Sequence, residues 1–390
     1  MKKILVLLLL VSGIMFTINL NVKETTAEES HSNIKIGELA FQYINAFIET
    51  CPRREAYSLG ESKAAKWISD EFTKIGYTAK TVEFGAEQYS SQNVIAVKKG
   101  NDTTKKVVIS AHYDSANGEG AFDNGSGIAI MLTLAQLIKN TDLTFDVEFV
   151  AFGAEEVGLV GSNYYIINEH TANILLDINL DIVVGGEKLY MYAEDINTIQ
   201  LDYFKNEAVK ANAPIEPRVN MNPIFISAGQ GISSNYTHIG MRNDAKTFKE
   251  NGIATLFLFS GNMDNGYGVY TEQGDNRKVM NTNNDTIIAI NKNEIRFKTQ
   301  SESVVKTVYN GLTNNQFYNI IKKAEVVDTF WYSSMTPILI FMALNFVAVI
   351  ISIIIKKRLH FDAVMTDPTA KEKKSIFGKP KEDDIFEFRK

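Results

Sequence analysis

Cysteine is almost absent from this chain, because Cys51 is the only one in 390 residues. A lone cysteine excludes an intrachain disulfide framework and a zinc module built from cysteine ligands. Basic residues are not in excess either: 40 Lys and Arg stand against 46 Asp and Glu, for a formal net charge of -6. Nucleic-acid-binding domains usually show a basic face, so we expect no nucleic-acid partner. With 45% hydrophobic residues, the composition is that of a globular protein held by a hydrophobic core.

The N-terminus has the pattern of a secretory signal. Met1-Lys2-Lys3 precede an apolar run over residues 4–20, and small, polar residues follow near Ala27. A basic start, an apolar stretch and a small-residue exit are typical of a signal peptide. We therefore predict that residues 1–27 are a signal peptide or a retained N-terminal anchor, with a buried N-terminal helix as the alternative.

Residues 337–355 form a second apolar run, which contains no charged residue and is followed by Lys356-Lys357-Arg358. About 20 apolar residues cross a bilayer core, and basic residues mark the cytoplasmic side. This predicts a transmembrane helix over residues 337–355, with a core helix as the alternative. It also predicts a cytoplasmic tail over residues 356–390 and an extracytoplasmic domain over residues 28–330. The chain is therefore expected to be a single-pass protein of the cell membrane after signal cleavage.

The middle of the chain alternates between helical and strand-like patterns. Helices are predicted where apolar residues recur at helical spacing, over residues 35–50, 61–75 and 128–138. Short apolar runs predict strands over residues 93–97, 107–111, 145–152, 174–182 and 254–259. Buried strands separated by helices indicate an α/β fold, a mixed and mostly parallel sheet with helices on both faces. No Pro- or Gly-rich linker divides residues 35–323, so we expect one domain here.

Polar residues with metal-binding chemistry gather where these predicted strands end, and active sites of such sheets lie at the carboxyl ends of strands. They are His112, Asp114, Asp123, Glu155, Glu156 and Asp181. Carboxylates brought so close repel one another unless a cation is bound. Imidazole and carboxylate ligands without cysteine suit zinc, and manganese or cobalt less specifically. Each signal alone is weak, since His112 is also compatible with a hydrogen-bonded structural histidine and a Glu pair with a solvated turn.

Other catalytic motifs are missing from the sequence. There is no His-Glu-x-x-His helix, no Gly-x-Ser-x-Gly nucleophile elbow, no dinucleotide fingerprint and no phosphate-binding P-loop. Cys51 has no obvious general base beside it and precedes a proline, so we expect it to be a small packing residue.

Four stretches resemble a known family: "VVISAHYDS", "GAFDNGSG", "VEFVAFGAEEVGLVGSNYY" and "NLDIV". Together with the upstream "RREAYSLGESKAAKWISDEFTKIGY" and "QNVIAVKKG", they are similar to the M28 family of zinc peptidases, which includes bacterial aminopeptidases. The resemblance covers roughly residues 36–315. It implies a zinc exopeptidase-like fold, a peptide substrate and one or two Zn²⁺ ions as cofactor.

The resemblance also implies a role for each site residue. His112, Asp123 and Asp181 would hold one zinc ion, Asp123 would bridge to a second ion, and Glu156 would bind that second ion. Asp114 would orient the His112 ring. Glu155, which is not a ligand, would act as general base, taking a proton from the attacking water and passing it to the leaving amine.

One position departs from the family pattern. The family's last ligand is a histidine in a His-Thr-x-x-Asp-Thr stretch, and here that stretch begins with Asn281. An amide oxygen is a poor zinc ligand, so the second ion should bind weakly. A Ser-Asp-His element of the family likewise becomes Asn243-Asp244-Ala245. His238 lies in a loop that is a candidate to reach the site.

Two functions therefore compete at this point. The first is a membrane-anchored zinc exopeptidase, most simply an aminopeptidase, and the retained Glu155 favours it. The second is a catalytically impaired domain that serves as a binding, receptor or scaffold module, and Asn281 favours that one. Substrate preference is expected to depend on the loops over residues 214–237 and 261–280.

Overall fold

The computed structural model describes residues 35–169, 171–193, 199–218, 243–261, 279, 281–321, 340–341, 345–347 and 350–356. The chain divides into two compact units, Met1–Lys322 and Lys323–Lys390. The predicted signal peptide over residues 1–27 and nearly all of the predicted tail over residues 356–390 lie outside the described residues.

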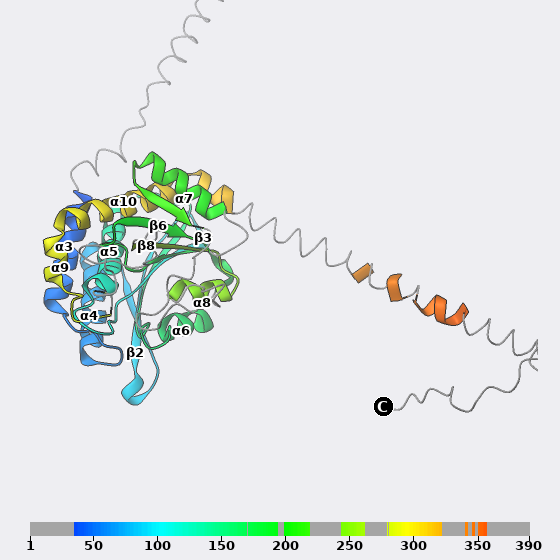
Figure 1. The fold of residues 1–390 in the computed structure, drawn as a ribbon, viewed down its shortest axis with the longest axis horizontal. Coiled ribbons are helices and arrows are strands. Elements are labelled where there is room, and N and C mark those ends of the chain that lie inside the picture. Colours follow the sequence, from blue (N-terminus) through cyan, green and yellow to red (C-terminus); the bar gives the residue numbers. More distant parts are fainter. Residues whose placement is uncertain are drawn as a thin grey trace, which may run out of the picture. The chain divides into compact units, whose positions relative to one another are not determined.

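The first unit is built around an eight-stranded sheet in the order β1-β2-β4-β3-β5-β8-β6-β7 (Figure 1). The centre of the sheet is parallel and consists of β4, β3, β5 and β8. On one side, β2 pairs antiparallel with β4, and β1 pairs antiparallel with β2. On the other side, β6 pairs antiparallel with β8. The strands are β1 (Ala79–Phe84), β2 (Ser91–Lys98), β3 (Asp102–His112), β4 (Phe145–Phe152), β5 (Ile174–Leu180), β6 (Lys188–Tyr192), β7 (Ile215–Arg218) and β8 (Thr255–Gly261). The sheet is thus mixed and mostly parallel, as predicted.

Helices cover both faces of this sheet (Figure 1). They are α3 (Ile36–Thr50), α4 (Leu59–Ile75), α5 (Ser126–Ile138), α6 (Val160–Asn168), α7 (Ile199–Lys210), α8 (Asp244–Glu250), α9 (Ile287–Lys292) and α10 (Glu294–Thr313). α3, α4, α5 and α10 contribute to the large core on one face, while α6 and α8 pack on the other. Short helical turns lie at Glu87–Tyr89, Ala121–Gly125 and Thr171–Asn173.

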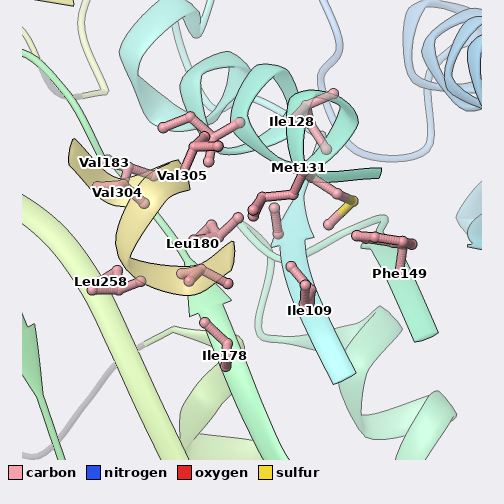
Figure 2. Packing of buried hydrophobic residues seen from close by; sticks show 14 of the residues in the cluster. Ile109, Ile128, Met131, Phe149, Ile178, Leu180, Val183, Leu258, Val304 and Val305 are labelled. Carbon is pink, nitrogen blue, oxygen red and sulfur yellow. The ribbon is translucent and has the colours of Figure 1, made fainter. Parts of the chain in front are cut away.

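The centre of the core is the packing of α5 and α10 over the parallel strands. Met131 of α5 lies among Ile109, Ile128 and Phe149, while Val304 and Val305 of α10 face the β5 side of the cluster (Figure 2). All of α5 except Gln136 is buried, and a helix that is apolar all round belongs inside a protein. Among the described residues, Ala121–Ile138 is the helix long and apolar enough to cross a membrane, and it is almost wholly buried in this core.

The predicted elements largely match the observed ones in position. The strand over residues 145–152 has the predicted bounds, and the helix predicted over 61–75 ends at Ile75, where Gly76 takes a left-handed conformation. The prediction for residues 107–111 was too short, because β3 begins at Asp102 and includes His112. Its first residues are polar and partly exposed, so hydrophobicity does not reveal them. Cys51 is buried in the core, in agreement with a packing role.

In the second unit, an apolar helix covers Asn345–Lys356. Its described side chains include Phe346, Val347 and Ile353, which are exposed. Residues 337–339 lie outside the described residues. A transmembrane role for residues 337–355 therefore stays a prediction.

Candidate metal centre

Three predicted ligands meet at the carboxyl ends of the central strands. His112 is the last residue of β3, Asp181 follows β5 directly, and Asp123 lies in the turn before α5. The His112 Nε2 atom lies 3.1 Å from Asp123 Oδ1 and 3.4 Å from Asp181 Oδ1. One ligand atom from each residue falls within 4.8 Å of the others, and all three residues are buried.

The chemistry of these three residues fits a zinc ion. One imidazole nitrogen and two carboxylate oxygens are a common zinc donor set, with room for a further ligand. Asp181 Oδ1 is buried and has no hydrogen-bond partner, which is expected of an atom that binds a cation. Burial by itself disfavours an imidazolium, yet Glu155 and Asp181 raise the pKa of His112 well above its ordinary value. The carboxylates around His112 therefore favour a positive charge at this position.

The turn between β5 and the next segment is held around Asp181 by one side chain. The Asn124 Nδ2 atom donates to the Leu180 carbonyl at 2.8 Å, and Asn124 Oδ1 accepts from the Ile182 N–H at 3.2 Å. The Leu180 carbonyl and the Ile182 N–H, on either side of Asp181, are thus both bonded to the Asn124 side chain. Because Asn124 follows Asp123 directly, these two hydrogen bonds connect the backbone around Asp181 with that around Asp123.

Glu155 and Glu156 lie on a sharp turn after β4, and two buried carboxylates hold that turn. Asp114 accepts the N–H groups of Glu155 and Glu156, each at 3.0 Å. Glu61 of α4 accepts the N–H of Ala154 at 2.8 Å. Carboxylates that accept backbone N–H groups make strong, charge-assisted bonds, so the two glutamates are fixed relative to β3 and α4.

Asp114 also lies beside the second nitrogen of the His112 ring, where the resemblance expected it. The distance from Asp114 Oδ1 to His112 Nδ1 is 3.5 Å, and His112 Nδ1 has no hydrogen-bond partner. The contact between Asp114 and the His112 ring is therefore longer than a good hydrogen bond. The firm bonds of Asp114 are those to the turn that carries Glu155.

Glu156 is paired with Asn281 across the site. Asn281 Nδ2 donates to Glu156 Oε2 at 3.3 Å, and Glu156 Oε1 is buried without a partner. Burial, together with the charge of Asp123, raises the pKa of Glu156 to about 9. Glu156 is not one of the three residues whose ligand atoms converge.

The segment that carries Asn281 is bonded to the loop before Asp123. Asp285 accepts the N–H of Phe122 at 2.7 Å and that of Asp123 at 3.1 Å. In return, the Glu119 side chain accepts the N–H of Ile287 at 2.7 Å. Two segments about 160 residues apart in sequence thus form one wall of the site.

Comparison with known proteins agrees with this geometry. The model of peptidase family M28 matches residues 93–301, which is more than half of the chain. The chain belongs to peptidase family M28. Its fold is also that of a zinc aminopeptidase from Bacillus subtilis, at a TM-score of 0.58 and 18% identity over 72% of this chain and 96% of that one.

Two similar proteins show how far the similarity extends. Aminopeptidase YwaD of Bacillus subtilis is 32% identical over 149 residues, 36% of this chain and 31% of that protein. The alkaline phosphatase isozyme conversion protein of Escherichia coli is 26% identical over 275 residues, 60% of this chain and 75% of that protein. The chain therefore spans under a third of the first of these relatives and three quarters of the second.

In this M28 domain, sequence reasoning overlooked several buried polar residues that support the site. Arg54 is fully buried and donates to the carbonyls of Cys51, Tyr113, Glu119 and Gly120. Glu61 could have been noticed, because Ser58-x-x-Glu61 is a capping-box pattern and Ser58 does cap α4. No local pattern marks Arg54, since its partners lie up to 66 positions away.

Asp244 is a further buried acid near the M28 site. It begins α8, and neither of its carboxylate oxygens has a hydrogen-bond partner. Burial raises the pKa of Asp244 to about 7. His238 and most of the loops over residues 214–237 and 261–280, which the sequence suggested as contributors to the site, lie outside the described residues.

One hollow on the described surface lies away from these residues. It measures about 940 Å³ and is bounded by the start of β6, β7 and the junction of α9 with α10. None of His112, Asp123, Glu155 or Asp181 lines it. The chemistry of the strand ends, and not the size of this hollow, marks the candidate site.

Proposed function

We propose that this M28 domain is a zinc-dependent aminopeptidase anchored to the cell membrane. The observation that carries the proposal is Glu155, a buried acid fixed on the turn beside the three converging ligands. The charged groups of Glu155 and His112 interact, and each shifts the pKa of the other. A glutamine would fill the same space, so packing alone does not account for an acid at this position. Its acid–base chemistry does.

Each residue has a task in this proposal. His112, Asp123 and Asp181 hold the zinc ion, and zinc when bound supplies Lewis acidity toward water and the scissile carbonyl. Glu155 accepts a proton from the attacking water and delivers it to the leaving amine. Burial raises the pKa of Glu155 well above its ordinary value, which makes its carboxylate a stronger base. Asp114 keeps the Glu155 backbone in place.

The aminopeptidase activity is proposed from the relatives. The similar protein of known fold is a zinc aminopeptidase, and YwaD is named an aminopeptidase. An aminopeptidase requires a free α-amine, which predicts that acetylation of the peptide N-terminus prevents cleavage.

The membrane anchor is proposed from residues 337–355, which carry no charge and precede three basic residues. The apolar helix Asn345–Lys356 supports it. The expected result is that the full chain stays in the membrane fraction through an alkaline wash. Recovery of the chain in the wash would rule out a spanning anchor.

A binding or scaffold role is the second candidate, and it is favoured by Asn281, which stands where the resemblance leads us to expect a ligand histidine. In that case the domain would hold zinc and bind peptides without cleaving them. Peptide binding without release of the first residue, at every zinc concentration, is the result that would select this function.

The test is release of N-terminal residues from a peptide panel by the full chain purified in mild detergent. We expect release that chelation removes and added zinc restores. Glu155→Gln should lower the rate at least about 100-fold, the usual contribution of a general base, while the zinc content stays unchanged. Glu187→Gln, an exposed acid beyond Asp181, is the matched control. Full activity in the Glu155 variant would exclude the proposed mechanism.

A further inference from the structure

The Asn281–Glu156 contact points to an unusual metal content. We infer that the chain holds a single zinc ion tightly, at His112, Asp123 and Asp181, and that the Asn281 amide bonds one oxygen of Glu156 in place of a second ion. The inference deepens the proposed function, because it takes zinc as the metal of the site. It concerns only how many ions bind.

The first step is the orientation of the amide. Asn281 Nδ2 faces Glu156 Oε2 at 3.3 Å. A carboxylate oxygen is an acceptor only, so an N–H group is the part of an amide that it attracts. An amide N–H does not dissociate near neutral pH and offers no lone pair to a metal. Binding a second ion would require breaking this bond and turning the amide oxygen toward Glu156.

The second step is the donor chemistry after such a turn. The second ion would then be held by Glu156, by a shared Asp123 and by a neutral amide oxygen. Zinc sites in proteins use Cys, His and carboxylate ligands, whereas carbonyl-type oxygens suit harder cations. The residues that the structure describes on this side of the site therefore do not fit a second zinc ion. They do fit the hydrogen bond from the Asn281 amide to the Glu156 carboxylate.

The third step is that the backbone keeps Asn281 in this place. Its φ is 56°, a left-handed conformation that Asn adopts more readily than most residues. Its carbonyl accepts from Asn117 Nδ2 at 3.2 Å, and Asp285 ties the same segment to Asp123. The side chain at position 281 is thus directed at Glu156 by contacts that do not depend on its identity. Histidine also tolerates this conformation, so it should take the same position.

The experiment is zinc titration of the full chain with the metal content measured after equilibrium dialysis. We expect one tightly bound zinc per chain in the wild type and a second ion bound at least about 100-fold more weakly, the upper range for a disturbed metal shell. Asn281→His should bring the content to two tight ions. Asn283→His adds a histidine to an exposed position of the same segment and should leave it at one.

A second variant keeps the test valid if Asn281→His does not fold. Asn281→Asp has the same shape and places a carboxylate beside Glu156, so it too should raise the affinity for a second ion. Two tight ions in the wild type, or one in both folded Asn281 variants, would overturn the inference. Metal content is independent of catalysis: one tight ion without peptide cleavage contradicts only the proposed function, whereas cleavage with two tight ions contradicts only this inference.

Discussion

The carboxylate of Asp285 accepts a hydrogen bond from the backbone N–H of Asp123 at 3.1 Å, across 162 positions of sequence. Its other oxygen accepts the N–H of Phe122 at 2.7 Å. Asp285 therefore positions Asp123, a candidate zinc ligand, through the backbone of Asp123. The same arrangement recurs at the neighbouring turn, where Asp114 accepts the N–H groups of Glu155 and Glu156. Buried acceptors, more than strand geometry alone, set the positions of the site residues.

The first prediction concerns Asp285. Asp285→Asn keeps the shape of the side chain but replaces one acceptor oxygen by a donor, which then faces a backbone N–H. The loop around Asp123 should shift, and the zinc affinity should fall about 10- to 100-fold, as for other residues that support metal ligands. The measurement is zinc competition with a chromophoric chelator.

Asp146 offers a matched control, because it is also buried and accepts a backbone N–H, that of Gly100, at 2.8 Å. It lies at the opposite end of β4 from the site. Asp146→Asn should therefore reduce stability without changing zinc affinity. Equal zinc affinity in the wild type and the Asp285 variant would show that Asp285 does not position the site.

The second prediction concerns Arg54, whose guanidinium donates to three carbonyls in the loop that leads to Asp123 and to the carbonyl of Cys51 at the end of α3. Arg54→Met removes a donor from each of these carbonyls, although Gly120 keeps the N–H of Gly125, and each buried acceptor left without a donor costs about 1–3 kcal/mol. We expect the free energy of unfolding to fall by about 3 kcal/mol or more in urea with a chelator present, so that zinc binding does not contribute. Arg53→Met, at an exposed neighbour paired with Glu55, should change it by less than about 0.5 kcal/mol. Similar values for both variants would contradict the structural role of Arg54.

The parts of the fold that the sequence predicts are those governed by local pattern. The strand over residues 145–152 is apolar throughout and central, so its bounds are readable. Asp181 could be placed near a strand end, but the strand predicted over residues 174–182 was too long, because β5 stops at Leu180. The short strands β6 and β7 were missed, because β7 has only four residues, one of them Pro217, and β6 depends on pairing with β8 and β7.

The supporting residues of the site are less predictable, for a physical reason. Arg54, Asp285 and Asn124 act on backbone groups, which look alike at every position of a sequence. Only the fold determines which N–H or carbonyl lies opposite them. The pairing of Asn281 with Glu156 is an intermediate case: the sequence draws attention to both residues, but it does not reveal the hydrogen bond between them.

The third prediction is a pH dependence that arises from Glu61. Burial raises the pKa of Glu61 from its ordinary value of 4.5 to about 7, against the effect of its bonds to Ser91, Tyr57 and Ala154. Between these two values the folded protein keeps a proton that the unfolded chain releases. Rising pH therefore favours unfolding, and stability should decline from about pH 4.5 to pH 7 by up to about 3 kcal/mol.

Urea unfolding of the metal-free chain at several pH values measures this decline. Glu61→Gln removes the titrating group, so the stability difference between the wild type and the variant should shrink or reverse as the pH rises through this window. Asp70→Asn changes an exposed acid of the same helix and is the control. Parallel pH profiles for the wild type and Glu61→Gln would refute the prediction.

The fourth prediction uses two glycines with almost the same backbone conformation, Gly118 at a φ of 77° and Gly252 at a φ of 74°. An added Cβ at Gly118 would lie 2.3 Å from the Thr282 carbonyl oxygen, whereas at Gly252 it meets nothing within 4 Å. Substitution by alanine costs about 1–2 kcal/mol at both positions, because L-residues disfavour this conformation. Only Gly118→Ala also pushes the loop before Asp123 away from the segment of Asn281 and Asp285. We expect Gly118→Ala to lower zinc affinity about 10-fold and Gly252→Ala to leave it unchanged, as measured by chelator competition. Equal zinc affinity in the two variants would mean that the contact between these two segments does not shape the metal centre.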